Sequence, residues 1–149
     1  MIRIRRDKHY PVKFDSMAWL EAVNYRGIRA ERVGAITIGL ETITDTHTME
    51  NVEVAKVVSI RVDEKWRREG IGTKLYEAAA KEACRKFKRP LASDRSRSEM
   101  AEGFWEKQVR KGRAVCAQER GDGSCVFYRL KDCGVKDLSG LRKKRRSRR

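Results

Sequence analysis

The residues best suited to chemistry form the segment 60–73, IRVDEKWRREGIGT. A β-branched run ends at Val62, a charged loop follows, and Gly70 and Gly72 open a stretch with helical spacing. The first backbone N–H groups of a helix have no partner inside the helix and lie at the positive end of its dipole, so they bind anions. Glycine lets a phosphate approach the backbone closely. The segment therefore predicts a phosphate-binding site at a helix N-terminus.

Two common nucleotide-binding motifs do not match this segment. A P-loop requires G-x-x-x-x-G-K-[ST], and the residues GIGTK at 70–74 have a different spacing. A Rossmann fingerprint requires a third glycine, which is absent here. The phosphate is therefore expected to belong to a different class of ligand.

The segment resembles the acyl-CoA signature of the GNAT superfamily of N-acyltransferases. That signature is [Q/R]-x-x-G-x-[G/A], and residues 67–72 read RREGIG. Further along, residues 98–107 (SEMAEGFWEK) are similar to the family's helix Asn-x-x-Ala-x-x-[Leu/Phe]-Tyr-Glu-Lys. The order of the elements matches that of the family over about residues 33–130.

The resemblance implies both a fold and an activity. The fold is mixed α/β, with a central, mostly antiparallel sheet that contains one splayed strand pair and is flanked by helices. The activity is transfer of an acetyl group from acetyl-CoA to a primary amine, by direct attack of the amine in a ternary complex. The helical region that the family places after its first strand is abbreviated here, because residues 8–18 have room for little more than a turn or a short helix.

The resemblance also assigns residues to the cosubstrate. In the family the end of this strand pairs with the pantetheine arm, a backbone amide near Val62 stabilises the oxyanion, and the loop amides hold the pyrophosphate. Ser98 takes the place of an Asn that commonly contacts the arm, and a helix N-cap is its alternative role. The residues expected to bind acetyl-CoA are Ile60, Arg61, Val62, Arg67, Arg68, Glu69, Gly70, Ile71, Gly72, Thr73 and Ser98.

The catalytic groups depart from the family pattern. The Tyr that protonates the leaving thiolate is replaced by Trp105, whose indole N–H is no practical proton donor. Glu53, in a central strand, is a candidate general base, with a solvated surface position as the alternative. Trp66 and Trp105 are expected at the ligand groove or its edge, and Tyr76 in side-chain packing.

The net charge bears on the acceptor and raises a second function. The chain has 36 Lys and Arg against 21 Asp and Glu, a net charge of +15, which favours anionic or nucleic-acid-associated acceptors over polycations. The alternative to an enzyme is a catalytically silent GNAT-like module that binds nucleic acid through its basic surface and tail.

Hydrophobic periodicity predicts the elements that must position these residues. Strands are expected at 1–6, 33–43, 52–62 and 91–93, and a closing hairpin at 113–118 and 124–130. Helices are expected at 70–87 and 99–110. The segment 19–26 is compatible with either a helix or a strand.

The length suits one domain, which we expect at residues 1–140. Seven of the last nine residues are Lys or Arg, and removing them from the net +15 leaves +8. We expect 141–149 to be a disordered basic tail, because like charges repel and no apolar residues offset the cost of ordering. Residues 142–149 are then a candidate nucleic-acid contact, a nuclear address in a eukaryotic host, or a solubilising tail.

The remaining features concern cellular location and metals. No stretch approaches the roughly 18–20 apolar residues of a membrane span, and we expect a soluble cytoplasmic protein without a membrane partner.

The four cysteines are Cys84, Cys116, Cys125 and Cys133. They form no C-x-x-C pair and lie far in sequence from both histidines, so no metal site is expected. They are interpreted as thiols in a reducing compartment, although Cys116 and Cys125 could face each other across a hairpin. The oligomeric state is not indicated.

Overall fold

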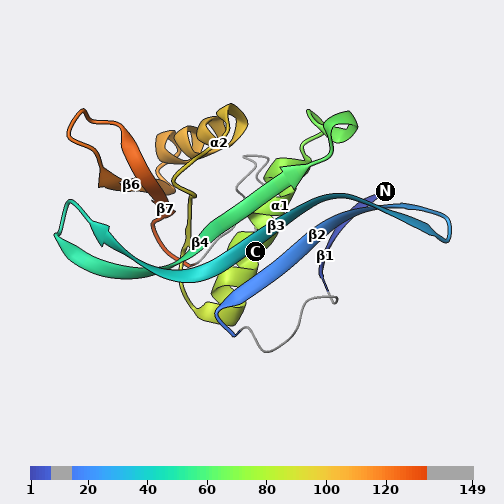
Figure 1. Cartoon of the computed structure of the whole chain (residues 1–149), viewed down its shortest axis with the longest axis horizontal. Helices are drawn as coiled ribbons and strands as arrows, with labels where there is room; N and C mark the ends of the chain where they lie inside the picture. Colours follow the sequence, from blue (N-terminus) through green and yellow to red (C-terminus); the bar gives the residue numbers. More distant parts are fainter. Residues whose placement is uncertain (8–14, 134–149) are drawn as a thin grey trace, which may run out of the picture.

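The structure of the protein is a computed structural model that describes residues 1–7 and 15–133. Seven strands form one mixed sheet in the order β1-β2-β3-β4-β5-β7-β6, antiparallel throughout except for the parallel pair β4 and β5 (Figure 1). The strands are β1 Ile2–Arg6, β2 Met17–Arg26, β3 Arg29–Asp45, β4 Glu50–Val62, β5 Leu91–Ala92, β6 Ala114–Glu119 and β7 Cys125–Leu130. The helices are α1 Ile71–Glu82 and α2 Glu99–Arg110, with a 3₁₀ turn η1 at Glu64–Trp66 and a π-helical turn η2 at Ala83–Phe87. This is the mixed α/β fold that the sequence predicts.

Helix α1 packs against β2, β3 and β4, which form a continuous antiparallel meander. Its buried stripe includes Leu75, Tyr76 and Ala79, and the small alanine lets the helix lie close to the sheet. Gly34 in β3 shows how close the packing is: a Cβ there would lie 2.9 Å from the Arg61 carbonyl oxygen and 3.3 Å from Leu75 Cδ1. A larger residue at position 34 would therefore push the helix off the strands.

The splayed strand pair lies between β4 and β5. These strands pair only at Ala55 with Leu91 and at Lys56 with Ala92, after which β5 ends. Strand β4 continues for six more residues to Val62, and no described strand pairs with it on the β5 side. The two halves of the sheet therefore separate along 57–62.

All four cysteines of the chain are paired in disulfides, so the prediction of thiols is wrong. Cys116 and Cys125 are joined across the β6–β7 hairpin, which is the proximity that the sequence left open as a possibility. Cys133 follows β7 and pairs with Cys84 in η2, at a sequence separation of 49 that no local pattern reveals. The prediction of a reducing compartment rested on free thiols and loses that support.

Several predictions concern residues outside the described ranges. The basic tail at 141–149 and most of the abbreviated segment at 8–18 are among them, so the domain boundary at residue 140 stays a prediction. In the part of the chain that is described, neither α-helix has the length and hydrophobicity needed to cross a bilayer.

Candidate active site

The open edge of β4 presents backbone groups that no strand of the described chain pairs with, although the Val62 carbonyl oxygen accepts a hydrogen bond from the Arg67 side chain. Alternate residues of a strand direct their N–H and C=O groups to opposite edges. The Asp63 N–H donates to the Val33 carbonyl oxygen at 2.8 Å, so odd-numbered residues from 59 to 63 face β3. Ile60 and Val62 therefore direct their backbone groups to the open edge, whereas Arg61 directs its own to β3. Two of the three residues expected along the pantetheine arm have the orientation that an extended ligand needs.

This edge leads directly to the N-terminus of α1. The connecting loop contains two residues with positive φ, Arg68 at 68° and the N-cap Gly70 at 78°. Gly70 provides no capping side chain, and the first intrahelical bond is donated by the Lys74 N–H to the Gly70 carbonyl oxygen. The N–H groups of Ile71, Gly72 and Thr73 are consequently the ones that lack intrahelical acceptors. These are the amides to which the sequence assigns the anion, and that assignment stays a prediction.

Arg67 fixes the loop to the strand. Its Nε donates to the Val62 carbonyl oxygen at 3.1 Å, which closes the turn between β4 and α1. The residue is otherwise exposed, so its remaining guanidinium N–H groups are accessible beside the helix N-terminus. Arg67 therefore has two roles. It holds the loop to β4, and its positive charge is available to a ligand.

Gly72 lies against the first turn of α2. A Cβ at this position would lie 3.0 Å from Met100 Cε and 3.2 Å from Met100 Sδ. Met100 itself is 51% exposed, so the thioether covers part of the helix N-terminus from outside. No local pattern in the sequence singles out Met100, because its contact is with a residue nearly thirty positions earlier.

Ser98 is the N-cap of α2. Its Oγ accepts a hydrogen bond from the Ala101 N–H at 3.1 Å, which is the capping role considered for it. The residue is exposed, so a contact with the pantetheine arm stays a prediction.

A buried polar network, unforeseen from the sequence, holds the loop between β5 and α2. The Arg97 side chain, 6% exposed, pairs with Glu102 at 2.6 Å and donates to the carbonyl oxygens of Val126 and Cys125, each at 2.8 Å. The Tyr128 hydroxyl donates to Glu102 Oε2 at 2.7 Å. Burial, followed by this bond to the carboxylate, raises the pKa of Tyr128 to about 12. The network orients α2 beside the separated strands.

Trp105 is fully buried, which corrects its predicted place at the groove or its edge. The indole stacks on Tyr128 with a centroid distance of 6.0 Å and meets Phe104 and Tyr76 edge-on. It lies inward because α2 directs residues 101, 104, 105 and 108 to the core. Tyr76 is in packing as predicted, and burial raises its pKa to about 12.

Glu53 lies apart from the open edge. It precedes the short β4–β5 pairing, and its carboxylate accepts from Arg89 Nε at 2.9 Å. The structure therefore does not bring this candidate base together with the open part of β4. No cluster of His, Cys, Asp and Glu able to hold a metal ion occurs among the described residues.

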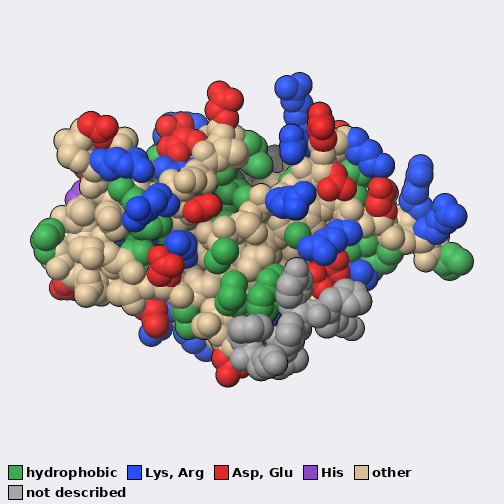
Figure 2. Space-filling model, viewed as in Figure 1, with side chains coloured by type: hydrophobic (Ala, Val, Ile, Leu, Met, Phe, Trp, Pro, Cys, Tyr) green, Lys and Arg blue, Asp and Glu red, His purple; other side chains and the backbone are tan. Residues whose placement is uncertain are grey.

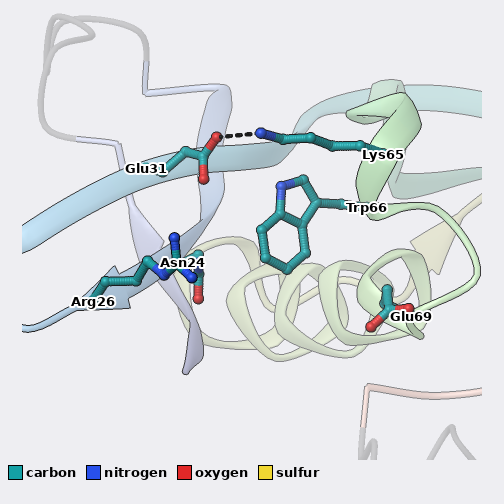
Figure 3. A pocket seen from close by; sticks show the side chains of 6 residues that line it. All are labelled: Asn24, Arg26, Glu31, Lys65, Trp66 and Glu69. Carbon is teal, nitrogen blue, oxygen red and sulfur yellow. Dashed lines mark ion pairs between the residues drawn. The ribbon is translucent and has the colours of Figure 1, made fainter.

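A pocket of about 340 Å³ lies between η1 and the turn end of the β2–β3 hairpin (Figure 3). We call it the hairpin pocket. It is lined by Asn24, Arg26, Glu31, Lys65, Trp66 and Glu69. Trp66 lines this pocket, and its expected place at the ligand groove or its edge stays a prediction. Local patterns do not reveal the hairpin residues, because these lie about forty positions before the loop.

The fold and this site together define the class of the protein. The model of the acetyltransferase (GNAT) family matches residues 12–109, which is 98 of the 149 residues, and the chain belongs to this family. A search of curated proteins found no match.

The solved structures that are similar to this chain include three whose names record a bound molecule. The KacTA–DNA complex is 14% identical, covers 83% of this chain and 70% of its own, and has a TM-score of 0.56. AtaT complexed with acetyl-methionyl-tRNAfMet is 11% identical, with coverages of 87% and 94% and a TM-score of 0.62. AtaTR bound with AcCoA is 12% identical, with coverages of 87% and 94% and a TM-score of 0.56. The TM-scores show a shared fold, and at identities this low they show the fold alone.

Proposed function

We propose that the protein transfers an acetyl group from acetyl-CoA to a primary amine of an anionic or nucleic-acid-associated acceptor. The observation that carries this proposal is the continuity of the open edge of β4 with the uncapped N-terminus of α1. An extended, amide-containing arm fits an unpaired strand edge, and a pyrophosphate fits free helix amides. Acetyl-CoA combines both groups in one molecule.

In the proposed reaction, the lone pair of the acceptor amine attacks the thioester carbonyl carbon. The amine first gives a proton to solvent, because a lysine-like amine has an unperturbed pKa of about 10 and is protonated at neutral pH. The tetrahedral oxyanion would accept a hydrogen bond from an edge amide of β4; the C–S bond then breaks to release a thiolate, and the nitrogen of the new amide gives its second proton to solvent. That thiolate takes its proton from solvent in our proposal, because Trp105 is buried and is no acid.

Two features support the choice of acceptor. The net charge of +15 favours encounter with anions, and Lys and Arg side chains are numerous at the end of the molecule where the β2–β3 hairpin projects (Figure 2). Two proteins of the same fold were solved with nucleic acid, one with DNA and one with an acetylated aminoacyl-tRNA. They make nucleic-acid-associated amines the first acceptors to test.

The substitution Gly72→Glu tests the cosubstrate site. It places a carboxylate against the expected pyrophosphate and displaces Met100, so acetyl-CoA binding should fall at least about a hundredfold in calorimetric titration. Gly103→Glu is the matched control, because a Cβ at this exposed position of α2 meets no atom within 4 Å. The control should bind acetyl-CoA like the unchanged protein. Equal affinity in all three proteins would exclude this site.

A catalytically silent binding module is the second candidate function, and the burial of Trp105 favours it. With Trp105 in place of a Tyr and Glu53 away from the open edge, the fold would bind a partner without turnover. Incubation with acetyl-CoA and mixed aminoacyl-tRNAs, followed by mass spectrometry for N-acetyl products, separates the two functions. Acetyl-CoA binding without any acetylated amine would favour the silent module.

A further inference from the structure

The hairpin pocket has a lining unlike that of the anion site next to it. The Glu31 carboxylate pairs with Lys65 Nζ at 3.1 Å, which neutralises one charge of each sign. Asn24 stands opposite Glu31 in the β2–β3 register, and its Oδ1 accepts from the Met1 amino group at 3.1 Å. Figure 3 shows the Trp66 indole at the centre, between the hairpin and Glu69.

Three groups of the lining remain available to a ligand. Among the described residues, neither Arg26 nor Glu69 has an ion-pair partner. Trp66 is half-buried, and its Nε1, which has no hydrogen-bond partner among the described residues, is covered from solvent. The pocket therefore offers an aromatic face, one free cation and one free carboxylate.

We propose that the hairpin pocket binds a nucleobase together with its neighbouring phosphate. A neutral base carries donors and acceptors on one edge and two flat faces, which matches a lining of balanced charge around an indole. Trp66 supplies the stacking face, the Glu69 carboxylate accepts from an exocyclic amine, and Arg26 donates to the phosphate. A simple anion would be repelled by Glu69, and an apolar ligand would leave the charged groups without partners.

A nucleobase with a neighbouring phosphate can come from acetyl-CoA or from a nucleic acid. The inference rests on the proposed function only if the source is acetyl-CoA. Glu69 directly precedes Gly70, so the pocket adjoins the phosphate site, and the adenosine 3′-phosphate end of acetyl-CoA is the first source. The second source is a nucleotide of a nucleic acid that lies along the hairpin. Beyond Arg26 the hairpin turns at Gly27, with Ile28 fully exposed and Arg29 on the returning strand.

The test measures binding by the full-length protein and three variants, with three probes. Trp66→Leu removes the stacking face and keeps apolar packing, and Arg26→Gln removes the phosphate contact. Arg29→Gln is the matched control, because Arg29 pairs with Arg26 across the hairpin but does not line the pocket. The probes are acetyl-CoA, S-acetyl-4′-phosphopantetheine, which lacks the adenosine, and single-stranded oligoadenylate. Thermal melting checks that each variant folds, and Arg26→Gln keeps the test valid if Trp66→Leu does not.

The two sources predict different patterns. If the pocket takes the cosubstrate, Trp66→Leu and Arg26→Gln weaken acetyl-CoA binding about tenfold, while S-acetyl-4′-phosphopantetheine binding is unchanged. If it takes a nucleic acid, the same variants weaken oligoadenylate binding about tenfold and leave acetyl-CoA binding intact. In both cases Arg29→Gln has a clearly smaller effect than Arg26→Gln.

Other outcomes overturn the inference. If Trp66→Leu folds and alters the affinity for no probe, or if Arg26→Gln and Arg29→Gln have equal effects, the pocket contributes only general surface charge. Failure of the proposed function gives a different pattern, in which no form of the protein binds acetyl-CoA although oligoadenylate binding still depends on Trp66.

Discussion

Glu102 connects α2 to Arg97 in the preceding loop and to Tyr128 in β7. Burial alone would raise the pKa of its carboxyl group, but the bonds from the Tyr128 hydroxyl and the Arg97 guanidinium outweigh burial and lower it from the ordinary value of 4.5. A lowered folded-state pKa means that the ionised carboxylate stabilises the fold. This stabilisation is fully present above pH 4.5 and is lost as the pH falls through the lower folded-state value.

Tyr128→Phe should therefore destabilise the protein in a pH-dependent way. The variant loses the hydrogen bond to a charged acceptor, which we expect to lower the free energy of unfolding by about 1 kcal/mol at neutral pH, after allowance for solvent screening. The difference from the unchanged protein should shrink below pH 4.5, as chemical denaturation at several pH values would show. Tyr25→Phe is the control, because the Tyr25 hydroxyl accepts a hydrogen bond from the Arg5 guanidinium at an exposed position. A pH-independent difference for Tyr128→Phe would contradict the role assigned to Glu102.

The helix start at Gly70 can be predicted from the sequence, whereas the residues of the polar network cannot. Gly70 and Gly72 act through backbone conformation and helix ends, which are local in sequence. Arg97 looks like a surface residue in a loop rich in Ser and Arg, and only the approach of β7 buries it. The error for Trp105 has the same origin: the motif gives its position on the helix, but packing against Tyr76 and Tyr128 decides which way the ring turns.

Most elements follow from local periodicity. The helix expected at 99–110 matches α2, and the strands expected at 52–62 and 124–130 match β4 and β7 to within two residues. The segment 19–26 is ambiguous in sequence because its apolar residues do not alternate, and it forms most of β2 because both β1 and β3 pair with it. Strand β3 begins earlier than expected, since residues 29–32 are mostly polar and their pairing with β2 is a tertiary effect.

The N-terminus of α2 provides a direct test of the two roles of Ser98. Ser98→Ala removes the cap on the Ala101 N–H and should lower the free energy of unfolding by about 1 kcal/mol. Ser98→Asn retains a capping side chain and should keep the stability of the unchanged protein. We expect acetyl-CoA affinity to be the same in all three proteins, measured by calorimetry. A selective loss of affinity in Ser98→Ala, rescued by Asn, would instead assign Ser98 a contact with the ligand.

The distribution of charge over the whole chain determines how strongly it attracts polyanions. Deleting residues 141–149 removes seven of the positive charges and reduces the net charge from +15 to +8. For single-stranded nucleic acid, the slope of log affinity against log salt should shrink by about 0.7 for each phosphate that the tail neutralises in the full-length protein. Acetyl transfer to a small amine should not change, because the phosphate site lies within the described part of the chain. An unchanged salt slope would show that the tail binds no nucleic acid.

The two disulfides differ in what they join, because only one of them links segments that the sheet does not already pair. Cys84–Cys133 joins the end of the first helical segment to the chain that follows β7, and it closes a loop with a separation of 49 residues. Cys116–Cys125 spans only the β6–β7 hairpin, with a separation of 9. Cross-linking removes more conformational freedom from the unfolded chain when the loop is longer, so the first disulfide should contribute more to stability.

The double substitution Cys84→Ser with Cys133→Ser should lower the free energy of unfolding by about 4 kcal/mol in the absence of reductant, whereas Cys116→Ser with Cys125→Ser should lower it by about 2 to 3 kcal/mol. Thermal melts of the unchanged protein with and without a phosphine reductant give the sum of both effects. Alkylation before reduction, followed by mass spectrometry, counts the free thiols and should find none. If instead all four cysteines are alkylated and reductant leaves the melt unchanged, the thiols predicted from the sequence are correct, and the chain after β7 is held by packing alone.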